Sequence, residues 1–301
     1  MSAGLFRSAE AAAAVERQYR GLLDRWPVPS VQHMLPTCQG PTFVLSCGPE
    51  GAPPVLLLHG AQANSASWMA DAALWSRSFR LHAVDMIGEA GLSAPVRPPL
   101  DGDAHARWLD DLFAGLGLSS AALVGTSLGG WLALDHAVRR PGKVDALALI
   151  CPAGIGRQKN FLLRNAPLLL LGRRGERRMR AKVFGPIPAE IPEAARPLAE
   201  MMATIGRTIR PRVVRIPRLS DEELERLRMP ILAVVGGRDA LIDSRETRDR
   251  LGRHAPRAEV AFIEEGYHFL PGQEGRVMDF LERHVGREGA SGSAAGDDLA
   301  R

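Results

Sequence analysis

The sequence predicts an α/β protein with a doubly wound, mostly parallel sheet that is interrupted by one helical insertion. Short apolar runs recur along the chain, separated by segments in which apolar residues have helical spacing. These runs do not alternate between apolar and polar residues, which is typical of strands buried on both faces in a sheet covered by helices. The predicted strands are 55–58, 81–84, 121–124, 146–150, 231–235 and 260–263.

The chain before these strands predicts two further elements. Helical spacing of apolar residues predicts a leading helix over 8–25, within an N-terminal segment 1–29. Two extended segments, 30–36 and 41–47, are separated by turn residues and predict an antiparallel hairpin at one edge of the sheet. The helices expected to cover the sheet are 67–76, 103–116, 128–139, 244–254 and 274–285.

The alternation of strands and helices breaks between 155 and 228, where proline and arginine are frequent. We therefore expect one core formed by 30–154 and 229–286, with 155–228 as a helical insertion. The insertion contains seventeen Arg and Lys against eight Asp and Glu, a balance of +9, so the rest of the chain has a balance of −5. The small, polar segment 287–301 is expected to be a disordered tail.

The composition is that of an ordinary globular protein. Of the 301 residues, 46% are hydrophobic and 24% are charged, which argues against a disordered chain. The apolar runs are far shorter than the roughly 20 residues of a spanning helix, so we expect no stable membrane insertion. The first residues lack the uninterrupted apolar core of a secretory signal, and a cytoplasmic protein is the default expectation.

The cysteines and the basic insertion suggest no cofactor or nucleic-acid chemistry. Cys38, Cys47 and Cys151 are too few and too scattered for a disulfide framework or a zinc site, so we expect reduced, structural thiols. The insertion is basic, but Phe161 and Phe184 are its only aromatic residues, and it contains no nucleic-acid motif. We therefore expect no metal, no organic cofactor and no nucleic-acid partner.

A serine motif lies between a predicted strand and a predicted helix. The run 125–130 reads Gly-Thr-Ser-Leu-Gly-Gly and has the strand–turn–helix setting of a G-x-S-x-G nucleophile elbow. The glycines permit a turn so sharp that the serine is held in a strained conformation with its hydroxyl exposed. The alternative is a serine that only caps the following helix. The setting favours Ser127 as a nucleophile.

A serine nucleophile needs a general base, and the base needs a carboxylate on its other ring nitrogen. His268 fits best among the eight histidines, because it follows the strand 260–263 and precedes the last helix. Asp239 and Asp243 both follow the strand 231–235. Asp243 fits the N-cap of a helix, with Glu246 reaching back to it, whereas Asp239 has no such structural role. We therefore predict that Asp239 orients His268.

An oxyanion formed at the substrate carbonyl needs two donors. The backbone N–H of Leu128, directly after the nucleophile, is one candidate, and the N–H of Ala61, in the turn after the first parallel strand, is the other. His59 in the same turn has no second metal ligand nearby in sequence, so an orienting structural role is favoured over a metal site.

Together these residues resemble the α/β-hydrolase superfamily. The resemblance covers about 54–285 except for the insertion, and its motifs are His59-Gly60 with Trp68, 85–93, 125–130, 236–239 and 266–268. The segment 85–93 departs from the family pattern D-x-P-G-x-G-x-S, because it has one residue more between the glycines and Ile87 in place of proline. The resemblance implies that the insertion is a helical cap. Since ligand pockets are mostly apolar, we expect Trp68, Leu169 and Leu170 to contact the substrate, with the arginines of the cap facing outward.

The sequence therefore predicts a serine hydrolase that cleaves a carboxylic ester or related acyl compound of small size through an acyl-enzyme on Ser127. Carbon–carbon bond hydrolysis, thioester hydrolysis and acyl transfer remain alternatives, because the same three residues serve them. A non-hydrolysing ligand-binding protein on the same scaffold is an alternative of another class. The sequence predicts no particular oligomeric state.

Overall fold

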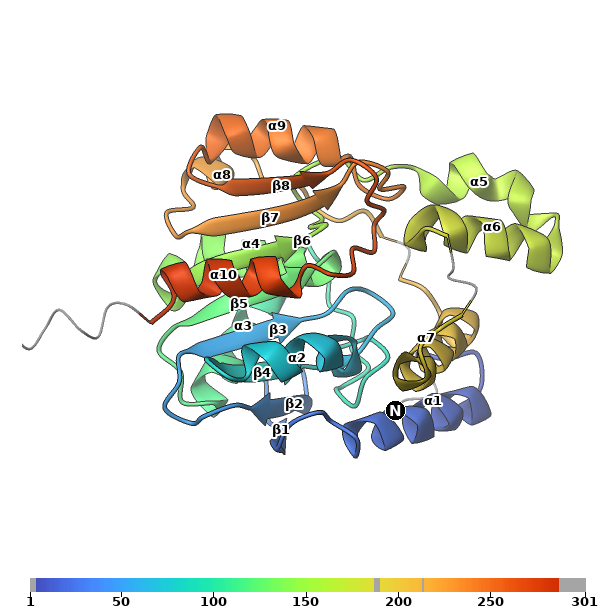
Figure 1. Cartoon of the computed structure of the whole chain (residues 1–301), viewed down its shortest axis with the longest axis horizontal. Helices are drawn as coiled ribbons and strands as arrows, with labels where there is room; N and C mark the ends of the chain where they lie inside the picture. The colour runs from blue at the N-terminus through green and yellow to red at the C-terminus, as the bar shows by residue number, and fades with distance from the viewer. Residues whose placement is uncertain (1–3, 187–189, 213, 287–301) are drawn as a thin grey trace, which may run out of the picture.

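An eight-stranded sheet forms the centre of the protein (Figure 1). The computed structural model describes residues 4–186, 190–212 and 214–286, so the predicted tail 287–301 lies outside the described residues. The strand order is β1-β2-β4-β3-β5-β6-β7-β8, and only β2 runs against its neighbours. The strands are β1 (Ser30–Leu35), β2 (Thr42–Cys47), β3 (Pro54–Leu58), β4 (Arg80–Val84), β5 (Ala121–Thr126), β6 (Val144–Ile150), β7 (Ile231–Gly236) and β8 (Glu259–Ile263). The predicted doubly wound sheet and its edge hairpin are confirmed.

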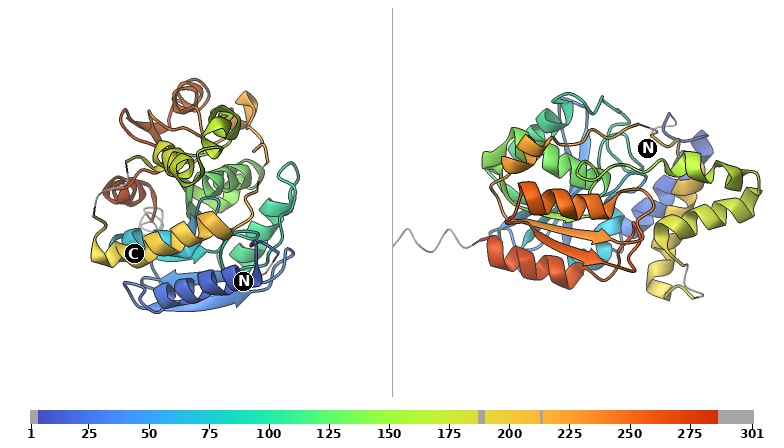
Figure 2. Two further views of the ribbon diagram at one scale, coloured as in Figure 1. Left: turned by 90° about the vertical axis from the view of Figure 1, so that its right-hand side faces the viewer. Right: turned by 90° about the horizontal axis from the view of Figure 1, so that it is seen from above.

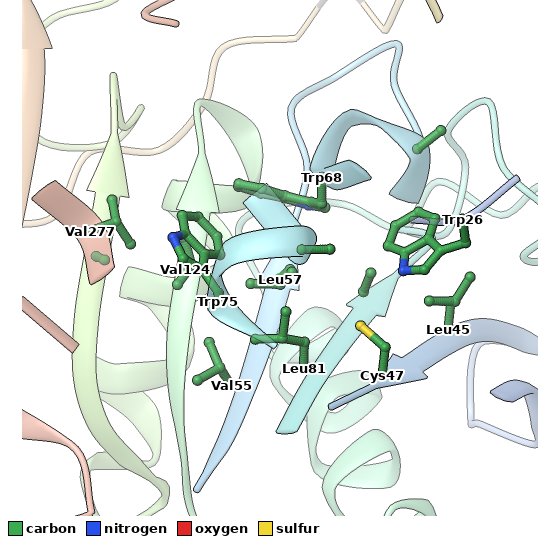
Figure 3. Close-up of a cluster of buried hydrophobic side chains, with 14 of the residues drawn as sticks. Trp26, Leu45, Cys47, Val55, Leu57, Trp68, Trp75, Leu81, Val124 and Val277 are labelled. Atoms are coloured by element: carbon green, nitrogen blue, oxygen red, sulfur yellow. The ribbon is translucent and has the colours of Figure 1, made fainter. Parts of the chain in front are cut away.

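Helices cover both faces of the sheet and bury two apolar layers. One layer contains Trp75 and Phe280, and the other contains Trp108 and Trp131. Figure 3 shows part of the first layer, where Trp75 lies over Leu57 and Val124. Burying one large apolar side chain contributes about 1.5–3 kcal/mol, so these layers carry much of the stability. The covering helices are α2 (Met69–Trp75), α3 (Ala104–Gly115), α4 (Leu128–Arg139), α9 (Ser244–His254) and α10 (Glu274–His284).

The two outermost strands differ from the buried ones. β8 was predicted to be buried on both faces, but all five of its residues are only half-buried. The prediction is wrong because β8 lies at the end of the sheet, where helices cover it incompletely. β1, at the opposite edge, is largely exposed. The apolar run of β8 therefore did not distinguish an edge strand from a central one.

The insertion is helical, and its parts pack in different places. It contains α5 (Phe161–Leu169), α6 (Gly172–Phe184), α7 (Arg196–Thr208) and α8 (Asp221–Glu225). The α5–α6 arm (residues 160–185) extends away from the body of the protein, as Figure 1 and the right-hand view of Figure 2 show. α8 instead packs beside α9 on the body. No helix in these described ranges is both long and apolar enough to cross a membrane.

The N-terminal segment is attached to the insertion as well as to the core. Helix α1 (Ala9–Leu23) packs beside α7 (Figure 1). Directly before it, Phe6 and Ile209 form an antiparallel bridge. The N–H of Arg210 donates to the carbonyl of Leu5 at 2.8 Å, and the N–H of Arg7 donates to Thr208 at 2.8 Å. The described part of the N-terminal segment, from Leu5 through α1, thus packs against α7 and the residues that follow it.

Candidate active site

Ser127 lies in the turn between β5 and α4 with a backbone that few residues adopt. Its φ is 52° and its ψ is −109°. Two glycines make this turn possible, because a Cβ on Gly125 would lie 2.6 Å from the carbonyl oxygen of Gly129, and one on Gly129 would lie 2.1 Å from that of Leu58. Although Ser127 precedes the helix, its side chain makes no capping hydrogen bond. The hydroxyl therefore remains free for other partners.

His268 connects the Ser127 hydroxyl to Asp239. Nε2 of His268 lies 2.9 Å from Oγ of Ser127, and Nδ1 lies 2.7 Å from Oδ2 of Asp239. The Asp239 side chain is fully buried, and the His268 side chain is 11% exposed. His268 comes from the loop between β8 and α10, so three separate loops at the carboxyl end of the parallel strands supply the three groups. The structure brings the three predicted side chains into one hydrogen-bonded chain.

The two candidate carboxylates occupy different positions. Asp243 caps α9 by accepting a hydrogen bond from the N–H of Glu246 at 3.2 Å, as predicted. The Glu246 carboxylate does not reach back to it, but binds Arg157 and Arg218 instead. Asp239 also has a structural role, contrary to the sequence prediction, because its Oδ1 accepts the N–H groups of Leu241 at 2.7 Å and Ile242 at 2.9 Å. These two bonds orient the carboxylate toward His268.

The turn after β3 lies against the serine. A Cβ built on Gly60 would be 3.7 Å from the Cβ of Ser127, so this backbone approaches the nucleophile closely. In the described part of the chain, the N–H groups of Ala61 and Leu128 donate to no other residue. The next residue, Gln62, has a positive φ of 60°, which is uncommon for a residue with a side chain. The N–H of Ala61 in this turn and the N–H of Leu128 at the start of α4 are therefore both unused by the described residues.

His59 fixes this turn to the loop after β4. It is fully buried, its Nδ1 lies 2.8 Å from the carbonyl of Gly60, and its Nε2 accepts the N–H of Met86 at 3.0 Å. Burial lowers the pKa of His59, which keeps the ring neutral and allows Nε2 to accept. Both ring nitrogens are thus engaged within the protein. The predicted orienting role agrees with these contacts.

Sequence reasoning missed Glu89, which supports the same turn. Its Oε2 accepts the N–H of Gln62 at 2.6 Å, and the residue is 3% exposed. Burial raises the pKa of Glu89, while the Gln62 N–H and the nearby Arg97 and Arg212 act in the opposite direction. Glu89 lies inside the segment 85–93, at the place where the spacing departs from the family pattern. This departure from the family pattern was the sequence signal that could have pointed to Glu89.

Asp85 anchors the other half of this loop. Its Oδ1 accepts hydrogen bonds from the backbone N–H and the hydroxyl of Ser65, at 2.8 and 2.7 Å, and from the hydroxyl of Tyr19 at 2.7 Å. Its Oδ2 accepts the N–H of Leu92 at 2.7 Å. A buried carboxylate with four donors is well satisfied, so Asp85 holds helix α1, the turn after β3 and the loop after β4 together.

Comparison with known proteins identifies the family. A model of the alpha/beta hydrolase family matches residues 55–279. The chain belongs to this family. The hydrolase is 30% identical to the carboxylesterase nap of Bacillus subtilis over 280 residues, which is 89% of this chain and 92% of that protein. It is 27% identical to carboxylesterase YbfK of the same organism, over 92% of this chain and 96% of that protein.

Solved structures agree with these relatives in fold. The crystal structure of carboxylesterase CesB (YbfK) from Bacillus subtilis matches with a TM-score of 0.77 at 28% identity, covering 91% of this hydrolase and 99% of that chain. The structure of naproxen esterase (carboxylesterase NP) from the same organism also matches with a TM-score of 0.77, at 27% identity, over 91% and 98% of the two chains. The similarity therefore includes the insertion as well as the core.

Two of the residues expected to contact substrate in the hydrolase, Trp68 and Leu170, lie in different surroundings. Trp68 is buried in the core layer beside Trp75, with ring centroids 6.0 Å apart, and Figure 3 shows both side chains within this apolar cluster. The Leu170 side chain is 89% exposed on the arm, so it lines no enclosed pocket in this conformation. The side chain of Leu169 lies outside the described residues. These positions give no support to the expected acyl-pocket lining.

The two ends of the arm contact the loops that carry Asp239 and His268. Directly before the arm, Nζ of Lys159 donates to the carbonyl of Asp239 at 2.6 Å. At its end, the carbonyl of Val183 accepts the N–H of His268 at 3.1 Å. The Phe184 and Phe269 rings also pack, with centroids 6.1 Å apart. The insertion of the hydrolase is thus attached directly to the two loops that carry Asp239 and His268.

Proposed function

We propose that this protein is a carboxylesterase that uses Ser127 as nucleophile, His268 as general base and Asp239 as the carboxylate that orients the base. The hydrogen-bonded chain from Ser127 through His268 to Asp239 carries the proposal. Two carboxylesterase relatives that align over about nine tenths of the chain support an ester as the bond that is cleaved. The substrate is a small molecule with an acyl group.

The geometry suits proton transfer in both halves of the reaction. Oγ of Ser127 attacks the ester carbonyl carbon while its proton passes to Nε2 of His268. His268 then gives this proton to the leaving alkoxide, the carbon–oxygen bond of the ester breaks, and the acyl group stays on Ser127. Water, deprotonated by His268, attacks the acyl-enzyme and releases the carboxylic acid. Asp239 keeps a proton on Nδ1 and stabilises the imidazolium form.

The oxyanion is bound by the N–H groups of Ala61 and Leu128. Both lie in backbone that closely approaches Ser127, and neither N–H is used elsewhere in the described residues. Leu128 is also the first residue of α4, where the helix dipole favours negative charge. Removing one such donor costs about 2.7–4 kcal/mol of transition-state stabilisation in a comparable hydrolase. Glu89 acts through Gln62 by fixing the turn that presents Ala61.

A panel of acyl esters and thioesters of graded chain length tests this function. Wild-type protein is expected to hydrolyse esters with a burst of one product, and an organophosphonate probe is expected to label Ser127. Ser127→Ala should fold normally and lose both turnover and labelling. Undiminished ester hydrolysis by Ser127→Ala, or labelling of another serine such as Ser93, would refute the proposal. Faster turnover of thioesters than of matched esters would show that the protein is a thioesterase and not a carboxylesterase.

A further inference from the structure

The turn that presents the N–H of Ala61 is held at its far end by Ser65. The turn begins at His59, directly after β3, and ends at the short 3₁₀ helix η1 (Ser65–Trp68). The backbone N–H and the hydroxyl of Ser65 both donate to Oδ1 of Asp85, at 2.8 and 2.7 Å. Because both groups bind one carboxylate oxygen, the position of the Asp85 carboxylate determines where the turn ends.

The Asp85 carboxylate is itself held by hydrogen-bond donors. It is fully buried, and it forms no ion pair with a residue in the described part of the chain. Besides the two groups of Ser65, its donors are the N–H of Leu92 and the hydroxyl of Tyr19, which lies 2.7 Å from Oδ1. A buried charge without a cation beside it depends on each of its donors. Loss of the Tyr19 hydroxyl should therefore shift this carboxylate.

Tyr19 reaches Asp85 from helix α1, 66 residues earlier in the chain. The side chain is fully buried, and its ring packs edge-on against Phe43 of β2, with ring centroids 6.3 Å apart. This contact fixes the direction of the hydroxyl. Burial and the negative charge of Asp85 raise the pKa of Tyr19, so the hydroxyl stays protonated and remains a donor at neutral and mildly alkaline pH.

We propose that Tyr19 is a positioning residue for the turn that binds the oxyanion. Its hydroxyl holds Oδ1 of Asp85 in place, this oxygen binds Ser65, and Ser65 fixes the turn from which Ala61 donates. A displacement of about 1 Å caused by a change far from the reacting atoms can cost about a hundredfold in rate. The inference rests on the proposed function, because it concerns the oxyanion of that reaction.

Steady-state kinetics of Tyr19→Phe test the proposal, because this change removes only the hydroxyl. On one ester, kcat should fall about threefold to thirtyfold, less than the loss of about 10²–10³-fold that follows deletion of an oxyanion donor. KM should change little. A boronic acid, which forms a tetrahedral adduct with a serine hydroxyl, should bind more weakly by a similar factor. A lower Tm with unchanged kcat and unchanged boronic acid affinity would overturn the proposal, since a hydroxyl that only stabilises the fold gives that result.

The variant Ser65→Ala tests whether the effect passes through Asp85. It removes the other hydroxyl on the same carboxylate oxygen and should lower kcat to a similar extent. In the double variant Tyr19→Phe/Ser65→Ala the two losses should not multiply, because both act through the position of one carboxylate. Losses that multiplied in full would show two separate routes and would overturn the route assigned to Tyr19.

The matched control is Ser46→Ala. The hydroxyl of the buried Ser46 lies 2.8 Å from Nδ1 of His82, so this change also deletes one buried hydroxyl hydrogen bond, but within β2 and β4 and not in a loop of the site. It should lower Tm and change kcat less than about twofold. Circular dichroism verifies that each variant is folded at the assay temperature. An equal loss of kcat in the control would overturn the proposal.

Failure of this inference and failure of the proposed function give different results. If kcat of Tyr19→Phe equalled that of wild type while Ser127→Ala was inactive, only the role of Tyr19 would be lost. Undiminished ester hydrolysis by Ser127→Ala would refute the proposed function and with it the inference about the oxyanion turn.

Discussion

The catalytic end of the core and the α5–α6 arm both contain apolar runs, but they bury them differently. Strands β5 and β7 are enclosed by helices on both faces, and the loop after β7 is fixed by the N–H groups of Leu241 and Ile242, which donate to the carboxylate of Asp239. On the arm, Leu163 and Leu170 extend into solvent. An apolar run therefore specifies a buried position only where the fold supplies a second layer to cover it.

The largest expected effect concerns the carboxylate that orients His268 at the catalytic end of the core. Asp239→Asn should lower kcat by about 10⁴-fold, the size found for the equivalent change in a chymotrypsin-type protease, because asparagine holds the histidine in the wrong tautomer. Asp243→Asn is the matched control and should change kcat little, since asparagine also caps helices well. Steady-state kinetics on one ester compare the two. A larger loss for Asp243→Asn would show that the wrong carboxylate was assigned.

A smaller effect should follow from the support of the oxyanion turn. Glu89→Ala removes the acceptor for the Gln62 N–H and should lower kcat about tenfold to a hundredfold, less than the 10²–10³ typical of deleting a donor outright. KM should change little, because the contact acts on the transition state. Glu89→Gln retains an acceptor oxygen and should recover most of kcat. If both variants matched wild type in kcat, the turn would not depend on Glu89.

A pH effect on stability should come from the half-buried Asp71 on α2. Burial, with Glu274 nearby, raises the pKa of Asp71 to about 7. Its neutral form is therefore favoured in the folded state, so its contribution to stability is complete below pH ~4 and is lost as the pH rises to ~7. Asp71→Asn should raise Tm at pH 8 by several degrees and leave Tm at pH 4 nearly unchanged.

Asp101→Asn, which alters an exposed carboxylate, serves as the control for this measurement. Thermal unfolding of both variants across pH 4–8 gives the comparison directly. If wild type and Asp71→Asn showed parallel Tm curves over this range, ionisation of Asp71 would have no part in the stability of the contact between α2 and α10.

The smallest expected effect concerns the arm. Arg177→Gln/Arg178→Gln should change kcat on a small, neutral, water-soluble ester by less than about twofold, because solvent-exposed charges far from the reaction contribute little to it. Steady-state kinetics on this ester measure the change in kcat. A severalfold change in kcat would show that these arginines influence the active site, and the contrast between arm and core would then be weaker than described.

The sequence predicted the parts of the site that depend on local chain geometry. Ser127 was found because the glycines of its turn are required by contacts within a few residues or with the adjacent strand. Glu89 was missed because its partner, Gln62, is separated from it by 27 residues, and no local pattern indicates that pairing. The prediction that Leu170 contacts the substrate rested on helical spacing and apolar character alone. Helical spacing shows which residues share a side of α5, but not which side faces the core.

The hydrogen bonds between the insertion and the loops that carry Asp239 and His268 affect how insertions can be exchanged among related enzymes. A chimera that replaced all of 155–228 would also replace Lys159 and Val183, whose hydrogen bonds reach Asp239 and His268. Its altered turnover would then combine a change in substrate selection with a displacement of the catalytic loops. Grafts that begin after Lys159 and end before Val183 keep both bonds. For recombination, the functional border of the catalytic unit lies inside the insertion.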